Sequence, residues 1–287
     1  AVETSDGWHL PNVSQAGDQS RAKKRGLGIA VSMKNSGFSF GFPEGSSARV
    51  ELYGATTIER AEVHTAAAEV GQGTHSALAQ LAAERLEIPL ERVRVVASDT
   101  ADIGDAGPAS ASRLTFFAGN AVVTAAGMAL ARWRDEDRPA VAEYRYNAPP
   151  TTPFDPETGA SVNSVSFSYA AQAVEVEVDT QTGLVRLERV VAVQDPGRAV
   201  NPQQVRAQIE GAVVQAQGWA VMENFVTEGG RILTDRLSTY LIPTARDIPS
   251  SVETHLLEKP DPEGPLGVRG VGEAPFGPLA PAIVCAV

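Results

Sequence analysis

The sequence has 287 residues, of which 43% are hydrophobic and 21% charged, and its formal net charge is -11. This composition is typical of a folded domain, and the length suits one large domain or two smaller ones. The negative charge argues against nucleic-acid binding, which depends on clustered Lys and Arg. The longest uninterrupted apolar run is far shorter than the ~20 residues of a membrane span, so we expect no membrane contact and a cytoplasmic protein.

Few residues are available for a protein-ligated metal. Cys285 is the single cysteine, which excludes an internal disulfide and a cysteine-ligated iron–sulfur cluster on this chain. The four histidines are scattered without the spacing of zinc ligands, so no protein-ligated metal is expected.

The chain divides into an arm and two halves. Residues 1–25 are polar and irregular, and "RAKKR" at their end is typical of a solvated linker. The first residue is alanine and no signal-like segment follows it, so we expect a processed chain or one piece of a longer polypeptide.

Residues 26–150 are expected to form a first half with strands followed by helices. Short β-branched and aromatic runs predict a hairpin up to residue 70, and helical spacing follows at 71–88. A buried strand is predicted at 92–98 and a tightly packed helix at 116–134. The proline-rich stretch that follows, up to residue 165, is typical of a long loop or crossover.

Residues 151–287 are expected to form a second half of the same kind. Two strands within 171–195 are joined by a turn at "DTQTG", where Gly183 suits a positive φ. A helix is predicted at 201–223, with Asn201 as its N-cap. The fold class is therefore α+β, with two subdomains that each layer strands and helices.

The segment "EVGQGTHS" joins a predicted strand to a predicted helix. Gly71, Gln72, Gly73 and Thr74 stand where the first N–H groups of the helix lack internal partners, which suits a phosphate. The alternative is a plain turn capped by Thr74.

The segment "SASRLTFFAGNAV" follows an acidic, glycine-rich loop. Ser110, Ser112, Arg113 and Thr115 are donors that could bind an anion. A solvated loop with capping serines is the alternative.

The segment "DPGRAVNPQQVRAQIEG" contains a turn and the start of a helix. Gln208 falls two turns into this helix and could point into a cleft. The alternative is a capped helix with a polar face.

The segment "GVRGVGEAPFGP" has a single carboxylate, Glu273, among glycines and prolines. Gly270 and Gly272 could bring Glu273 close to a ligand without obstruction by a Cβ atom. In an apolar surround such a carboxylate can act as a general base, whereas the alternative is an exposed acid on a loop.

In their order and spacing these segments resemble the molybdenum-binding large subunit of the xanthine dehydrogenase and aldehyde oxidase family. The resemblance runs from about Gly26 to the end and matches the C-terminal half of that family's molybdopterin-binding region. Six ordered segments carry it: "KNSGFSFGFPE" like the family's opening hairpin, "VGQGTHSALAQLAAERLEIP", "SASRLTFFAGNAV", "DPGRAVNP" with "AQIEGAVVQAQG", "STYLIPTARDIP" and "GVRGVGEAP".

The resemblance implies a molybdopterin cofactor, which in the family is often joined to a nucleotide and can take the cytosine dinucleotide form. Glu273 stands at the catalytic glutamate and would take the proton from the molybdenum-bound hydroxyl that attacks an aldehyde or N-heterocycle, with water as the oxygen source. The cofactor contacts that the resemblance implies are Gly71, Gln72, Gly73, Thr74, Ala111, Ser112, Arg113, Leu114 and Gln208. No protein residue ligates the metal, which the family's pterin holds through its sulfur atoms.

The chain also departs from the family pattern. The family's molybdenum region is about twice as long and carries a GGGFGGK-like segment that is missing here. We therefore expect a split subunit or part of a longer chain, inactive alone, that partners the rest of the molybdenum-binding subunit and the 2Fe-2S and FAD modules. The alternatives are a non-catalytic cofactor-binding or scaffold subunit and a domain that keeps the fold without a cofactor.

Overall fold

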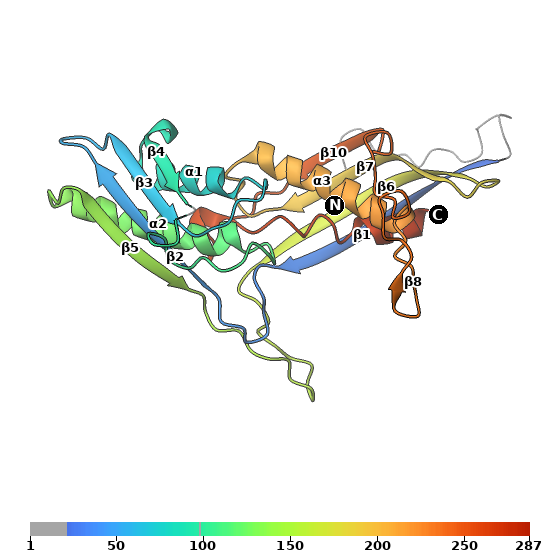
Figure 1. Ribbon diagram of the computed structural model, residues 1–287, viewed down its shortest axis with the longest axis horizontal. Helices are drawn as coiled ribbons and strands as arrows, with labels where there is room; N and C mark the ends of the chain where they lie inside the picture. Colours follow the sequence, from blue (N-terminus) through green and yellow to red (C-terminus); the bar gives the residue numbers. More distant parts are fainter. Residues whose placement is uncertain (1–21, 98) are drawn as a thin grey trace.

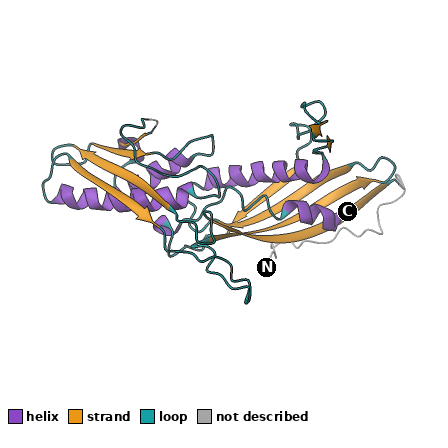
Figure 2. Cartoon of the chain, turned by 60° about the horizontal axis from the view of Figure 1, so that its bottom comes forward, coloured by secondary structure: helices purple, strands orange, loops and turns teal. Residues whose placement is uncertain are grey.

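The computed structural model describes residues 22–97 and 99–287. Two four-stranded sheets stand at opposite ends of an elongated molecule, and helices pack against both (Figures 1 and 2). The α+β fold class predicted from the sequence is confirmed. Most of the predicted arm, residues 1–21, lies outside the described residues, whereas its last residues begin the first strand.

One sheet, here sheet A, has the strand order β1–β6–β7–β10. Neighbours β1, β6 and β7 are antiparallel, and β10 is parallel to β7. Gly183, at φ 76°, makes the tight β6–β7 turn as predicted. The strands of sheet A are β1 (Lys23–Asn35), β6 (Phe167–Asp179), β7 (Val185–Asp195) and β10 (Ser251–Leu256).

The other sheet, here sheet B, has the strand order β4–β3–β2–β5. Alternation along β2 buries Ala48, Val50 and Leu52 on one face and leaves polar side chains on the other. The strands of sheet B are β2 (Gly45–Tyr53), β3 (Arg60–Thr65), β4 (Val93–Val96) and β5 (Ala140–Asn147).

Four α-helices and several short elements complete the described chain. Helix α2 lies against β2, β5 and α1, while α4 packs on β1 and β6 and contacts α3. The helices are α1 (Thr74–Leu86), α2 (Leu114–Arg134), α3 (Pro202–Val221) and α4 (Leu279–Ala286). The short elements are 3-10 turns η1 (Leu90–Arg92) and η2 (Pro265–Gly267) and the ribbon β8 (Thr227–Glu228) with β9 (Arg231–Ile232).

Helix α2 is the most apolar long helix of the described chain. By length and composition it could cross a membrane, with a mean hydropathy of 1.6, but 61% of that stretch is buried inside the protein. Its buried face is mostly small, including Ala118, Ala121 and Ala125, which lets α1 and sheet B approach closely. The burial is that of a core helix.

The strand pairing differs from the predicted halves in three places. Strand β1 precedes sheet B in the chain but pairs with β6 in sheet A, so a division at residue 150 does not follow the sheets. Residues 34–44 were expected to form a hairpin but instead cross from β1 to β2 in the other sheet, with Ser39 and Phe40 at positive φ. Residues 140–147, expected in a loop, form β5, because their apolar–polar alternation outweighs the prolines nearby.

Candidate functional site

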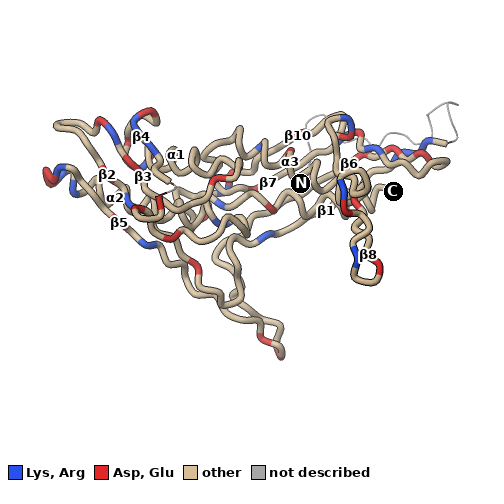
Figure 3. The backbone as a smooth tube through the Cα atoms, in the orientation of Figure 1, with Lys and Arg blue, Asp and Glu red and all other residues tan. Residues whose placement is uncertain are grey.

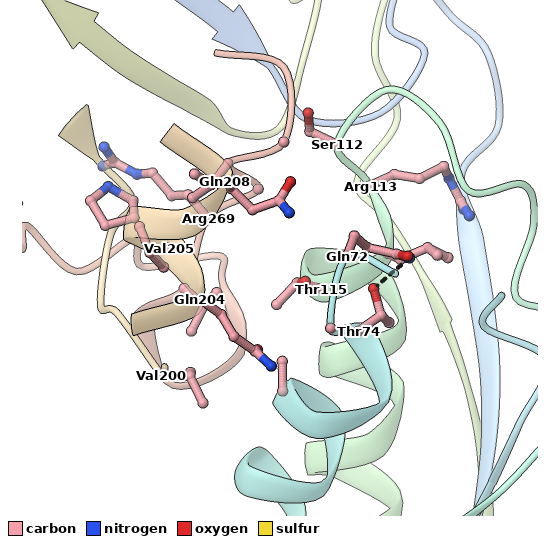
Figure 4. Close-up of a pocket in the computed structure, with 18 of the residues that line it drawn as sticks. Gln72, Thr74, Ser112, Arg113, Thr115, Val200, Gln204, Val205, Gln208 and Arg269 are labelled. Atoms are coloured by element: carbon pink, nitrogen blue, oxygen red, sulfur yellow. Dashed lines mark hydrogen bonds between the residues drawn. The ribbon is translucent and has the colours of Figure 1, made fainter. Parts of the chain in front are cut away.

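A cavity of about 440 Å³ lies between α1 and α2 on one side and α3 with the loop before α4 on the other. The first turns of α1, α2 and α3 and the glycine-rich loop before α4 line it. Figure 4 shows α3 facing α1 and α2 across this space. Because the N-terminal end of each helix carries about half a positive charge, three such ends favour a negatively charged or electron-rich ligand.

The cavity brings together the segments singled out in the sequence. Gln72, Gly73 and Thr74 line it from α1, residues 111–114 from the start of α2, Gln208 from α3, and Glu273 from the last loop. Of the residues expected to contact a cofactor, Gly71 is not among the lining residues.

The GQG turn closes on an internal acid. Gly73 is the N-cap of α1 at φ 84°, and an added Cβ there would lie 2.6 Å from Nε2 of Gln204. The carboxylate of Glu69 accepts hydrogen bonds from the N–H groups of Gly71, Gly73 and His75 at 2.8, 2.9 and 3.1 Å. A phosphate bound at these N–H groups would therefore have to displace Glu69. The alternative in which Thr74 caps the helix is not observed, because the N-cap residue of α1 is Gly73.

The two predicted glutamine contacts differ in availability. The amide of Gln72 donates to the carbonyl of Ala68 and to Oγ1 of Thr74, both at 2.9 Å, and accepts from the N–H of Val70 at 2.7 Å. The amide of Gln208 points into the cavity (Figure 4), and no hydrogen bond is recorded for it within the described chain. Of these two glutamines, Gln208 is the one whose amide is open to a ligand.

Residues 111–114 form a strained turn at the start of α2. Ala111 and Ser112 have φ values of 53° and 51°, in the left-handed region that is costly for residues with a Cβ atom. The carbonyl of Ala111 accepts from the N–H of Gly37, which fixes the turn against the β1–β2 crossover. Leu114 is the first residue of α2.

The side chain of Arg113 has a structural position rather than the predicted ligand contact. It is only 2% exposed, and its guanidinium donates to Glu44 at 2.8 Å and to the carbonyls of Gly45 and Ala106. In Figure 4 it points away from Gln208. Its backbone is paired as well, because the N–H donates to the carbonyl of Ser110 and the carbonyl accepts from the N–H of Phe117. The sequence did not reveal that Glu44, far along the chain, would bind this arginine.

Glu273 lies at the rim of the cavity. Its side chain is 50% exposed, and its Oε2 lies 3.2 Å from Nζ of Lys34 on β1. Ser112 Oγ donates to the same carboxylate at 3.1 Å and accepts from the Glu273 N–H at 3.0 Å. The acid shares the cavity with Gln72 and Gln208, and its surroundings are half-exposed and polar rather than apolar.

Close packing holds the loop that carries Glu273. A Cβ on Gly270 would lie 1.9 Å from the carbonyl oxygen of Ser112, so only glycine fits there, whereas Gly272 meets nothing closer than 3.7 Å. Beyond Glu273, Ser32 Oγ donates to the carbonyl of Ala274 at 3.1 Å and Gln172 Nε2 to that of Pro275 at 2.6 Å.

Arg269 ties the other end of this loop to the turn before α3. Its guanidinium binds Asp195 at 2.7 Å and Asp261 at 3.0 Å, and both carboxylates are largely buried. The backbone N–H of Arg269 also donates to the carbonyl of Pro196 at 2.8 Å. The loop that carries Glu273 and the turn before α3 therefore form one rigid wall of the cavity. Helix α3 begins at this wall, and Asn201 accepts from the N–H of Gln204 as its predicted N-cap.

Sequence reasoning missed two residues next to the site. Lys34 sits within a quoted motif, but its contact with Glu273 depends on β1 lying beside the last loop. Glu69 directly precedes the GQG turn, and an acid just before a helix start is a recognisable signal of N-terminal capping.

Comparison with known proteins gives consistent matches over most of the chain. The family model for the molybdopterin cofactor-binding domain matches residues 3–141 and 130–249. The chain is 33% identical over 304 residues to a probable xanthine dehydrogenase component from Bacillus subtilis (strain 168), over 92% of this chain and 39% of that protein.

Solved structures give the same result. The aldehyde oxidoreductase of Desulfovibrio gigas superposes with a TM-score of 0.82 at 27% identity, over 94% of this chain and 30% of that one. Quinoline 2-oxidoreductase from Pseudomonas putida 86 superposes with a TM-score of 0.78 at 26% identity, over 93% of this chain and 39% of that one. The chain thus spans less than half the length of each of these three proteins.

Proposed function

We propose a function for this chain, which belongs to the molybdopterin cofactor-binding family of the xanthine dehydrogenase and aldehyde oxidase enzymes. The chain is a component of a hydroxylase that oxidises an aldehyde or N-heterocycle with water as the oxygen source. One observation carries the proposal: four motif segments distant in sequence meet around one cavity, with the single lining carboxylate, Glu273, at its rim. The volume, about 440 Å³, is typical of small-molecule sites.

The residues around the cavity fit a molybdopterin. The lining residues include no histidine and no cysteine, which agrees with a metal held by the sulfur atoms of its own cofactor. Gln208 would donate or accept through its open amide, and the backbone of Ala111, Ser112 and Leu114 at the start of α2, which no side chain caps, would hold the electron-rich pterin and its phosphate. When bound, this cofactor would supply two-electron oxidation of the substrate.

Glu273 would act as the general base. Its carboxylate would accept a proton from the water-derived nucleophile. Ser112 Oγ would hold it in place by donating to the carboxylate and by accepting from the backbone N–H of Glu273. Lys34 would hold a positive charge beside the carboxylate, 3.2 Å from its Oε2.

The chain would hold only part of the site. Ile29, Val31 and Met33 of β1 are 62, 76 and 58% exposed, an apolar row that the remaining part of the molybdenum-binding subunit would cover. We infer that electrons leave through 2Fe-2S and FAD modules outside this chain, in the cytoplasm, and that the pterin can carry a cytosine nucleotide. The isolated chain would then show no turnover with aldehydes or N-heterocycles.

The experiment replaces the acid in the reconstituted holoenzyme. Glu273→Gln should lower kcat by about 10²- to 10⁴-fold while the molybdenum content per protein stays unchanged. Glu91→Gln, an exposed glutamate on η1, is the matched control and should retain full activity. Near-normal rates for Glu273→Gln would favour the second candidate, a cofactor-binding or scaffold subunit whose acid is not used.

A further inference from the structure

A second cluster of ionisable groups lies on the outer face of sheet B, away from the cavity. The opposite face of this sheet packs on α2, so the polar side chains of β2 and β3 point the other way. Figure 3 shows basic and acidic residues along these strands at one end of the molecule. The cluster centres on His64, with Glu51 and Glu62 beside it.

The register of sheet B creates an unfavourable pair. Glu51 of β2 and Glu62 of β3 are directly opposite each other, and like charges in such a pair destabilise a sheet. The ring of His64 lies beside both, with Nε2 3.6 Å from Oε1 of Glu51 and 3.9 Å from Oε2 of Glu62. Arg49 pairs with Glu51 at 2.8 Å and Arg60 with Glu62 at 3.6 Å, and a cation beside His64 would relieve the repulsion that remains.

His64 presents an unpartnered nitrogen to the two carboxylates. The residue is 6% exposed, and its Nε2 is buried without a hydrogen-bond partner among the described residues. Its other ring nitrogen, Nδ1, lies 2.8 Å from Oδ2 of Asp102. Asp102 is itself paired with Arg49 at 2.6 Å, and Nη2 of that arginine lies 3.1 Å from the same ring nitrogen of His64.

In the tautomer whose Nδ1–H donates to Asp102, the lone pair of a neutral His64 is on Nε2 and faces the two glutamates. A carboxylate that orients the far nitrogen of a histidine is the usual support for a metal-ligating imidazole. Arg49 holds the same unit together, because it donates to Glu51 and to Asp102 at 2.8 and 2.6 Å. Glu51 Oε1 keeps a further lone pair for a ligand.

We propose that His64 Nε2, Glu51 Oε1 and Glu62 Oε2 form a binding site for a divalent transition-metal ion of the zinc type. The three ligand atoms lie within 4.8 Å of one another. Tetrahedral bonds of ~2.0 Å require separations of about 3.3 Å, so side-chain shifts of a few tenths of an ångström to about an ångström would close the site. Water would complete the coordination.

The ion would link β2 to β3 and, through Asp102, to the loop between β4 and α2. This site is separate from the proposed cofactor cavity, and the inference does not depend on the proposed function. Spacing along the chain does not reveal it, because the register of two paired strands brings the ligands together.

The first experiment is a zinc titration of the chelator-treated full chain by calorimetry, in the presence of a competing chelator. We expect one Zn²⁺ per chain, with affinity lowered at least about tenfold by His64→Gln and by Glu62→Gln, and about 10- to 100-fold by Asp102→Asn. His255→Gln, an exposed histidine on β10, is the matched control and should bind as the wild type does. If His64→Gln fails to fold, Glu62→Gln serves as the test variant, because it preserves the shape of the side chain.

Two outcomes would overturn the proposal. One is a wild-type chain that binds no zinc, or that binds zinc no more tightly than the folded His64→Gln or Glu62→Gln variant does. The other is an NMR spectrum in which both ring nitrogens of His64 carry protons and do not respond to Zn²⁺, since a second proton would then supply the positive charge. Tetrahedral Co²⁺ absorption in the wild type but not in His64→Gln would support the site.

Discussion

Nζ of Lys34, at the end of the first strand, lies 3.2 Å from Oε2 of Glu273, 239 residues further along the chain. The two side chains are 31 and 50% exposed, so solvent and salt screen the attraction between them. The same carboxylate also accepts from Ser112. Glu273 is therefore held by charge and by a hydrogen bond at the open edge of a cavity.

A double-mutant cycle would measure the ion pair. Lys34→Met and Glu273→Gln, alone and combined, should give a coupling free energy of about 0.2–1 kcal/mol in urea unfolding, the range of exposed pairs. The coupling should shrink at about 1 M NaCl, because the Debye length falls to ~3 Å. A coupling near 3 kcal/mol that salt does not change would show that the pair is desolvated.

Loss of the Ser112 hydroxyl should affect the rate more than substrate binding. Ser112→Ala removes both hydrogen bonds to Glu273, and a loss of about 1.4 kcal/mol corresponds to about tenfold in kcat of the reconstituted holoenzyme, with KM near the wild-type value. Ser76→Ala, an exposed serine on α1, is the control. An unchanged kcat would mean that Ser112 does not orient the acid.

The carboxylate of Glu69 should make stability depend on pH. Partial burial raises its pKa, but hydrogen bonds from the N–H groups of Gly73, His75 and Gly71 outweigh this, so the net pKa lies below the ordinary value of 4.5. A lowered folded-state pKa means that the stabilisation is complete above pH 4.5 and is lost as pH falls through the folded value.

The corresponding variant is Glu69→Gln. It should lower the free energy of unfolding by about 1 kcal/mol at neutral pH, the usual size of a lost helix cap, and the difference should fade in acid. Urea unfolding at neutral pH and in acid measures this difference in the free energy of unfolding. Glu210→Gln, at an exposed position on α3, is the control. A difference that persists in acid would rule out a charged cap.

The two glycines before Glu273 should differ sharply. Gly270→Ala would place a Cβ 1.9 Å from the Ser112 carbonyl oxygen, and relieving that clash should cost about 3 kcal/mol of stability. Gly272→Ala, whose nearest contact would be 3.7 Å, should cost less than about 1 kcal/mol. Thermal unfolding of both variants tests this, and equal losses would contradict the close approach.

Local signals in the sequence predicted local structure well. The Asn201 cap, the Gly183 turn and the end of α2 at Arg134 follow from residues within a few positions of each other. Four of the six segments that carried the resemblance meet at the cavity. Such features depend on short-range rules of capping and turn geometry.

Partners distant in the chain were not predictable in the same way. Glu44 binds the Arg113 side chain away from the cavity, and Lys34 places a charge beside Glu273. The first contact depends on the crossover from β1 to β2, which a single sequence does not distinguish from a hairpin, and the second depends on β1 lying beside the last loop. The roles of Arg113 and Glu273 therefore required the three-dimensional arrangement.

The pairing of β1 with β6 also has a consequence for biosynthesis. All of sheet B, residues 45–147, is encoded between these two partners, so it emerges from the ribosome as a continuous unit before β6 exists. Strand β1 must wait unpaired through more than a hundred residues of translation, with Ile29, Val31 and Met33 in a β-prone strand. Closing so long a loop is slow, and nascent chains stalled before residue 167 should be the species that needs chaperone protection.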